Sequence, residues 1–201
     1  LEIDVGSVLF DFEDDNSHLS HEISTLARQS WWKSSTHTSP DENLWYTPMD
    51  LSNANDRALY LSARKNAWLS LYPSEQSFDG KTFLSDAKSS QKVDPKFVLH
   101  TMCRNEKIGI LQMNPKYEPS LQAGYISFLY MDPAHRCKGL GVQLLGQAIS
   151  TYRPMGKNRL HLACSPKNLT AQHFYARNGF RKISETKGAF GPLDLMEKLI
   201  Q

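Results

Sequence analysis

Two glycines one residue apart, Gly139 and Gly141, stand between a strand-like run and a helix-like run in "YISFLYMDPAHRCKGLGVQLLGQAISTY". A helix N-terminus presents backbone N–H groups without partners and carries a partial positive charge. Glycines ahead of such a helix let the backbone approach a ligand closely and adopt positive φ angles. The turn "HRCKGLG" is therefore a candidate cradle for a phosphate or pyrophosphate, with Arg136 and Lys138 adding positive charge at its mouth.

Two familiar nucleotide-binding templates do not fit this turn. A P-loop continues from its first glycine to a Gly-Lys-Ser/Thr triplet, and no such triplet follows Gly139 or Gly141. A dinucleotide fingerprint places a small residue where Leu144 stands, and an acid about 20 residues later, where the sequence reads "HLACSP". The remaining readings are a different phosphate ligand, or two glycines that merely tighten a turn.

The surrounding residues favour a specific ligand. "MDPAHRCKGLG" resembles motif A of the GNAT acyl-CoA-dependent N-acetyltransferases, with Arg136, Gly139 and Gly141 at the signature positions. The downstream run "NLTAQHFYARNGF" is similar to the next characteristic segment of that family. The resemblance covers roughly residues 44–201. It implies an α/β (α+β) fold with a mixed, mostly antiparallel twisted sheet of six or seven strands, flanked by about four helices.

The resemblance also implies direct transfer of an acetyl group from acetyl-CoA, as co-substrate, to a primary amine, with no metal. The backbone of the strand would bond the pantetheine arm, the turn amides would hold the pyrophosphate, and residues of the downstream segment would contact the coenzyme. The expected coenzyme-binding residues are Leu129, Tyr130, Met131, Arg136, Cys137, Lys138, Gly139, Leu140, Gly141, Asn168 and Tyr175. Arg136 and Lys138 are expected to help only as exposed charges, and Val142 is expected to face the core.

Attack of a neutral amine on a thioester requires carbonyl polarisation and a proton for the departing thiolate. By resemblance Tyr175 is the candidate acid, and the alternative is that it fills the core beside Phe174. The strand before the turn has no glutamate to act as the base. Tyr125 and Ser127 share a face by period two, and either is a candidate to relay a proton through water.

Other titratable residues receive structural interpretations. They are Asp132 as a turn residue, His161 as a satisfied structural histidine in mid-strand, His135 as a surface residue, Cys164 as a non-acylated strand-end cysteine, and the His18/His21 pair as solvent-exposed.

The elements that must position these residues begin at residue 44. Strands are predicted over 44–49, 96–103, 107–114, 123–132, 158–165, 180–186 and 193–200, and helices over 55–72, 79–90, 139–151 and 168–178. Asn55 or Asp56 is the expected cap of the first helix, and Pro73 is expected to stop it. Gly179 fits the left-handed residue that ends the last helix.

The amine acceptor, a small molecule or a peptide, is expected between the first helix, the loop after it and the last hairpin. Aromatic candidates there are Trp45, Tyr46, Tyr60, Trp68 and Tyr72. A homodimer is a further possibility. The alternative function is a non-catalytic acyl-CoA-binding module attached to a phosphatase-like domain.

Composition favours an ordinary globular protein. Of 201 residues, 40% are hydrophobic and 22% charged, and 23 basic against 21 acidic side chains give a net charge of +2. This balance argues against nucleic acid or an anionic membrane as the main partner. Cys103, Cys137 and Cys164 form no disulfide or zinc pattern, so a cytoplasmic, reducing setting is expected. No apolar run reaches the roughly 18 residues of a membrane span.

Residues 1–43 differ from the rest and are interpreted as an N-terminal extension or linker. "NSHLSHEISTLARQSWWK" looks similar to the tail of histidine-phosphatase domains that precede an acetyltransferase in some bacterial fusion proteins. The chain starts at Leu1 inside a strand-like run, which suggests a piece of a longer protein with an upstream phosphatase-like domain. An ordinary extension is the alternative.

Overall fold

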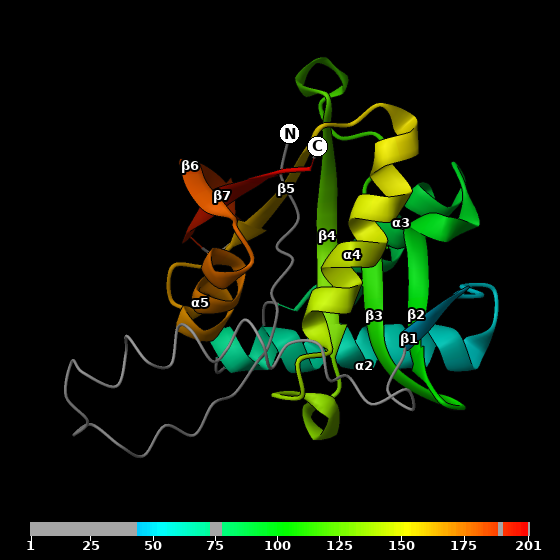
Figure 1. Ribbon diagram of the computed structural model, residues 1–201. Coiled ribbons are helices and arrows are strands. Elements are labelled where there is room, and N and C mark those ends of the chain that lie inside the picture. Colours follow the sequence, from blue (N-terminus) through cyan, green and yellow to red (C-terminus); the bar gives the residue numbers. More distant parts are fainter. Residues whose placement is uncertain (1–43, 73–77, 189–190, 201) are drawn as a thin grey trace, which may run out of the picture.

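The computed structural model describes residues 44–72, 78–188 and 191–200 of the chain (Figure 1). The predicted phosphatase-like tail and the His18/His21 pair lie outside these residues.

The described residues contain seven strands and four α-helices. The strands are β1 (Leu44–Pro48), β2 (Val98–Cys103), β3 (Glu106–Met113), β4 (Ala123–Met131), β5 (Arg159–Cys164), β6 (Arg181–Gly188) and β7 (Gly191–Leu199). The helices are α2 (Ala54–Leu71), α3 (Gly80–Gln91), α4 (Gly141–Tyr152) and α5 (Leu169–Arg177). Short 3₁₀ turns lie at Pro95–Phe97, Pro119–Leu121, Pro133–His135 and Arg153–Met155.

The strands form one sheet in the order β1-β2-β3-β4-β5-β7-β6. Every neighbouring pair is antiparallel except β4 and β5, which are parallel. A parallel pair needs a crossover connection, and α4 supplies it. The predicted mixed, mostly antiparallel sheet with flanking helices is therefore confirmed.

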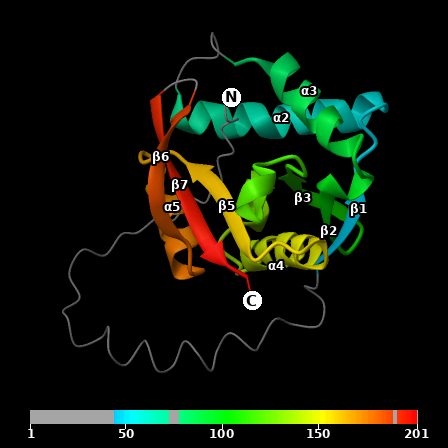
Figure 2. The ribbon, with the colours of Figure 1, turned by 90° about the horizontal axis from the view of Figure 1, so that it is seen from above.

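The sheet is the middle of three layers. Seen from above, α2 and α3 cover one face, and α4 and α5 lie on the other (Figure 2). Apolar side chains of α2 and α3, such as Trp68 and Phe83, pack with Val98, Ile110 and Phe128 of the sheet. A larger cluster joins α4 and α5 to alternate residues of the same strands. This alternation of inward faces is what the period-two pattern of the strands produces.

Helix α2 begins one residue earlier than predicted, and its cap is different. Asn53 is the N-cap, and its side-chain oxygen accepts from the backbone N–H of Asn55 at 2.8 Å. The expectation that Asn55 or Asp56 caps the helix is therefore wrong. Asp56 lies in the first turn, and its carboxylate bonds His100 at 2.9 Å and Lys107 at 2.7 Å. This cluster ties the start of α2 to strands β2 and β3.

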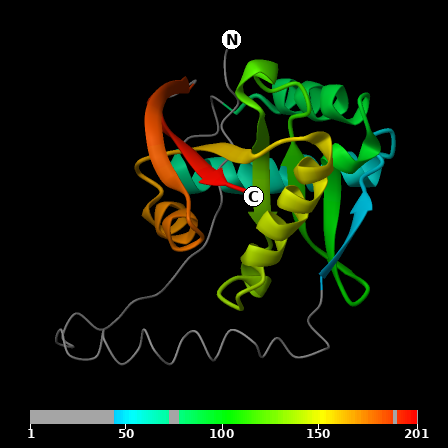
Figure 3. The same cartoon turned by 45° about the horizontal axis from the view of Figure 1, so that its top comes forward.

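Helix α4 is fixed to the sheet at its C-terminal end. The Tyr152 hydroxyl lies within hydrogen-bond distance of two backbone carbonyls, Asn114 at 3.0 Å and Tyr125 at 2.9 Å, which share it as a donor. The ring of Tyr152 fills the space where a Cβ on Gly124 would stand. Gly124 is therefore a position where close approach of helix and strand requires glycine. The N-terminal end of α4 follows the turn that comes after β4 (Figure 3).

Candidate functional site

Strands β4 and β5 pair over only part of their lengths. The parallel register runs from Ala123–Arg159 to Ile126–Leu162, while β4 continues to Met131. Among the described strands, the second half of β4 therefore pairs only with β3. Its other edge is free to bond a ligand as a strand would.

The pairing with β3 determines which groups of β4 point toward that free edge. Asp132 N–H donates to Ile108 O at 2.7 Å, and hydrogen-bonded and non-bonded pairs alternate along an antiparallel ladder. The backbone groups of Leu129 and Met131 are thus directed away from β3, whereas those of Tyr130 are directed toward it. Of the three predicted strand residues, Leu129 and Met131 have backbone groups directed toward the free edge, and Tyr130 does not.

A β-bulge interrupts β4 where it leaves β5. Gln112 of β3 pairs with Phe128 and Met113 pairs with Ile126, so Ser127 is the extra residue. A bulge bends its strand and increases the local twist, which helps the two strands diverge. The bulge also breaks the alternation on which the shared face of Tyr125 and Ser127 was predicted. Both side chains are buried.

The turn after β4 has the backbone that the glycine spacing suggested. Cys137 and Gly139 have φ angles of 60° and 73°, in the left-handed region. Within the described residues, no backbone carbonyl accepts from the N–H groups of residues 138–142, and the first bond at this end of α4 is from Gln143 N–H to Leu140 O. These N–H groups are the ordinary orphan donors of a helix N-terminus and are suited to an anion.

Two neighbours of the turn differ from the predictions. Arg136 is buried rather than exposed, and its Nε donates to the Met131 carbonyl at 2.9 Å. It therefore fastens the end of β4 to the turn, whereas Lys138 is exposed as expected. Val142 is 50% exposed and does not face the core. The helix buries Leu144, Leu145 and Ala148 instead.

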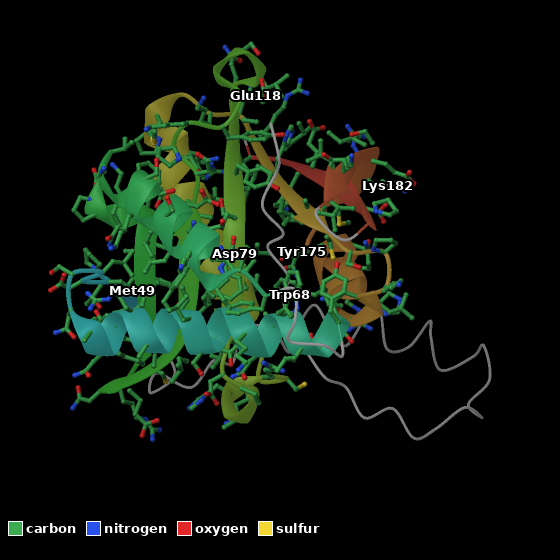
Figure 4. All side chains as sticks on the ribbon, turned by 180° about the vertical axis from the view of Figure 1, so that it is seen from behind. Met49, Trp68, Asp79, Glu118, Tyr175 and Lys182 are labelled. Carbon is green, nitrogen blue, oxygen red and sulfur yellow. The ribbon has the colours of Figure 1, made fainter. Side chains whose placement is uncertain are left out.

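Tyr175 of α5 is 1% exposed and packs against Phe174 and Phe180, with ring centroids 5.4 Å away in both cases. Burial raises the pKa of its phenol well above the usual value, and Cys164 and Tyr125 raise it further. The phenol is therefore protonated and able to donate. From behind, Tyr175 lies between β4 and α5, above Trp68 of α2 (Figure 4).

The ends of α5 are fixed by the residues that the sequence singled out. Asn168 is the N-cap, and its side-chain oxygen accepts from Ala171 N–H at 3.1 Å. Gly179, at φ 83°, follows the helix in the left-handed conformation that was predicted. Both features set the position of Tyr175.

Cys164 is fully buried at the end of β5. Burial raises the pKa of its thiol to about 12, and the nearby Asp194 carboxylate adds to the shift. Since the thiolate is the nucleophilic form, Cys164 is not suited to carry an acyl group at neutral pH.

Three buried polar residues beside the site form a chain that the sequence did not reveal. The Tyr117 hydroxyl lies 3.2 Å from His161 Nδ1, and His161 Nε2 lies 3.1 Å from Glu197 Oε2. The ring of Tyr117 stacks on Tyr125, with centroids 4.4 Å apart. His161 is a satisfied histidine, as predicted. The burial of Glu197 could have been inferred from the sequence, because Glu197 continues the two-residue spacing of the inward-facing Leu193 and Leu195 of β7.

The other residues that the sequence singled out, namely Asp132, His135 and the aromatic acceptor candidates, lie outside this buried chain. Asp132 accepts from Ala134 N–H at 3.0 Å, as a turn residue should, and His135 is half-buried. The aromatic acceptor candidates are spread over the molecule: Trp45 and Tyr46 on the edge strand β1, Tyr60 bonded to Phe83 O and Gln112 in the core, and Trp68 in tilted ring contact with Tyr72 at the end of α2. Of these, only the last pair comes from the α2 terminus that leads to the loop after it.

Within the described ranges, no cluster of three or more His, Cys, Asp or Glu side chains is arranged to hold a metal ion. In the same part of the chain, no helix has the length and apolar character needed to cross a membrane.

Known proteins similar to this chain are acetyltransferases. The family model of the acetyltransferase (GNAT) family matches residues 58–180. No curated protein matches the chain.

Solved structures share the fold at low sequence identity. A putative acetyltransferase from Salmonella typhimurium, yncA with its cofactor acetyl-CoA, has a TM-score of 0.59 and 19% identity, over 79% of this chain and 95% of that one. The PaiA N-acetyltransferase from Thermoplasma acidophilum, in complex with coenzyme A, has a TM-score of 0.58 and 18% identity, over 78% of this chain and 99% of that one. A spermidine N-acetyltransferase SpeG chimera from Vibrio cholerae and hSSAT has a TM-score of 0.59 and 14% identity, over 78% of this chain and 95% of that one.

Proposed function

The chain belongs to the acetyltransferase (GNAT) family, and from this premise we propose that residues 44–201 transfer an acetyl group from acetyl-CoA to a primary amine. One observation carries the proposal: the free edge of β4 runs directly into a glycine turn whose N–H groups, at the N-terminus of α4, donate to no backbone carbonyl within the described residues. A strand edge and an anion cradle in sequence fit a ligand with an amide-bearing arm and a pyrophosphate, which describes coenzyme A.

The proposed binding mode uses backbone groups that already face the unpaired edge of β4 and the turn after it. Leu129 and the N–H of Met131 bond the pantetheine arm as a neighbouring strand would. The N–H groups from Cys137 to Gly141 bind the pyrophosphate, with exposed Lys138 nearby. Arg136 acts indirectly, because it occupies the Met131 carbonyl and holds the turn in place.

The chain's own residues then handle the protons of the transfer. Acetyl-CoA supplies the thioester carbonyl and a thiolate leaving group. The buried phenol of Tyr175 donates the proton that the thiolate takes up. Asn168 caps the helix that carries Tyr175, and its side-chain nitrogen is proposed to contact a coenzyme amide. The neutral thiol of Cys164 supports direct transfer without an acyl-enzyme.

The acceptor reaches the thioester from the face of the sheet that bears α2 and α3. Tyr125 and Ser127 lie where β4 parts from β5, and they are proposed to flank the reacting bond. Among proteins of this fold, one acts on spermidine, and amines of this kind or the N-terminus of a peptide are the acceptor classes proposed here.

Calorimetry with acetyl-CoA tests the coenzyme site. Gly139→Glu places a carboxylate beside the pyrophosphate and should weaken binding at least tenfold through like-charge repulsion. Gly156→Glu is the matched control. Gly156 has a φ of 74° against 73° for Gly139, a Cβ at either position meets nothing within 4 Å, and Gly156 follows the opposite end of α4.

The backbone strain and added charge are thus the same in both variants, and only the distance from the turn differs. Equal affinity of the two variants, or failure of the wild type to bind, would contradict the proposed site. Binding of acetyl-CoA without acetylation of spermidine or of a peptide N-terminus would favour a non-catalytic acyl-CoA-binding module instead.

A further inference from the structure

The buried chain of Tyr117, His161 and Glu197 lies at the point where β4 and β5 part. Tyr125 and His161 are direct partners in the last stretch of parallel pairing, and Tyr117 stacks on Tyr125. Each of the three residues is no more than 9% exposed. Burying three polar side chains is costly unless they are bonded to one another, and these are bonded in a single line.

The charge of Glu197 fixes the direction of the hydrogen bonds. Burial raises the pKa of its carboxyl, but bonds from His161 and Arg159 outweigh burial and lower the pKa overall. Glu197 is therefore ionised and can only accept, so Nε2 of His161 carries the hydrogen. In that tautomer Nδ1 of His161 is the acceptor for the Tyr117 hydroxyl. This order, phenol to imidazole to carboxylate, is the one that lets an imidazole take up a proton.

Titratable and charged groups approach this imidazole from every neighbouring element. They are Tyr117 in the β3–β4 loop, Tyr125 on β4, Glu197 on β7, Arg159 on β5 at 3.1 Å from Glu197, and Arg181 on β6 at 3.6 Å from Glu197. Hydrogen bonds from His161 and Arg159 keep the Glu197 carboxylate charged against the effect of burial, and Arg181 lies on its other oxygen.

The chain also lies close to the donor that serves the leaving group. The phenol of Tyr125 is near enough to Tyr175 to act on it electrostatically, and Tyr125 is in ring contact with Tyr117. Buried tyrosines from both faces of the sheet therefore come together where β4 and β5 diverge. Tyr175 of α5 lies on one face, and Tyr117 and Tyr125 lie on the other.

We propose that Tyr117, His161 and Glu197 form the proton relay that deprotonates the amine acceptor during acetyl transfer. This inference rests on the proposed acetyl transfer. Tyr117 contacts the amine, and His161 and Glu197 act through it as positioning residues. The relay fills the place of the glutamate base that the strand before the turn lacks.

The protons balance over one turnover. As the C–N bond forms, an N–H proton of the amine passes to the Tyr117 oxygen, and the phenol proton moves to Nδ1 of His161. As the C–S bond breaks, its electron pair stays on sulfur, which takes the proton of Tyr175. After the products leave, the imidazolium releases its proton to solvent and Tyr175 regains one. The net change is one amide and one thiol.

The test compares Tyr117→Phe and His161→Gln with the wild type, with spermidine and a peptide bearing a free N-terminus as probes and thiol release as the readout. Both variants should lower kcat at neutral pH by about 100-fold, the usual scale for loss of a proton-transfer group. The KM for acetyl-CoA should stay within about twofold, because the coenzyme does not contact the relay.

The pH profile separates a relay from a merely structural role. The deficit of both variants should shrink as pH rises, since the amine and solvent hydroxide then need no internal base. His100→Gln is the matched control, because His100 is equally buried and bonded to a carboxylate at 2.9 Å, but lies on β2 beside Asp56. It should leave kcat and the pH profile unchanged.

Each outcome decides the proposal. If the wild type acetylates either amine while Tyr117→Phe keeps the wild-type kcat and pH profile, the relay is wrong and the acetyltransferase proposal stands. If the wild type acetylates neither amine, both proposals are overturned together. Tyr117→Phe removes one oxygen and keeps the stacked ring, so it carries the test even where His161→Gln fails to fold.

Discussion

At the scale of single residues, Tyr175 combines a packing role with a chemical one. Its ring is part of the core between Phe174 and Phe180, and its phenol stays protonated because burial raises its pKa. Tyr175→Phe removes the donor and keeps the ring. We expect kcat for acetyl transfer to fall about 100-fold, with little change in melting temperature or in acetyl-CoA affinity.

Tyr152→Phe is the control for this prediction. Tyr152 is also fully buried, and its hydroxyl bonds the carbonyls of Asn114 and Tyr125. Its loss should reduce the free energy of unfolding by roughly 1–3 kcal/mol, because the buried Tyr125 carbonyl and the half-buried Asn114 carbonyl lose the hydroxyl that they share, and should leave kcat unchanged. A Tyr175→Phe enzyme as fast as the wild type would remove Tyr175 from the mechanism.

The sequence predicts the residues of the turn better than their environments. Gly139, Lys138 and the cap at Gly179 have the conformations or exposure that local rules indicate. Arg136 and Val142 do not, because burial depends on how far a side chain reaches across to another element. The carbonyl that binds Arg136 belongs to Met131, five residues earlier, and this contact exists only once β4 and the turn are folded together.

At the scale of elements, the seven strands and four helices follow from periodicity and breakers, but their registers do not. The bulge at Ser127 depends on how β4 pairs with β3, and the end of the β4–β5 pairing at Ile126 depends on a strand that follows only after α4. The same holds for Glu197, which meets His161 because β7 lies between β5 and β6. The relay is therefore a product of topology rather than of any local motif.

The contact between α4 and β4 gives a testable consequence at this scale. Gly124→Ala places a methyl group into the ring of Tyr152, and we expect the free energy of unfolding to drop by about 1–3 kcal/mol. Gly146→Ala, within α4 and with nothing within 4 Å of the new Cβ, should instead stabilise the protein by roughly 0.5–1 kcal/mol. Chemical denaturation of the two variants measures both effects, and equal changes would contradict the close approach of helix and strand.

At the scale of the whole molecule, stability in acid depends on the cluster that joins α2 to the sheet. Burial alone would raise the pKa of Asp56, but hydrogen bonds from Lys107, His100 and the Asp50 backbone outweigh burial and lower the pKa to about 2. A carboxyl with a depressed pKa in the folded state stabilises the fold above its unfolded pKa and loses that contribution as pH falls. Burial also lowers the pKa of His100, so protonation of this imidazole in acid acts in the same direction.

We therefore expect the free energy of unfolding to fall as pH drops from about 4 to about 2, and Asp56→Asn to remove about 2 kcal/mol at neutral pH and to flatten this acid limb. Asp86→Asn tests the sign, because burial raises the pKa of Asp86 despite the opposing effect of Arg64. A carboxyl with a raised pKa in the folded state stabilises the fold at low pH, and this contribution is lost as pH rises. In acid, the free energy of unfolding of the wild type should therefore rise relative to that of Asp86→Asn. Over the same pH range, the wild type should lose its stability advantage over Asp56→Asn. Denaturation curves at a series of pH values measure both differences, and parallel curves for wild type and Asp56→Asn would show that the cluster does not hold α2 to the sheet.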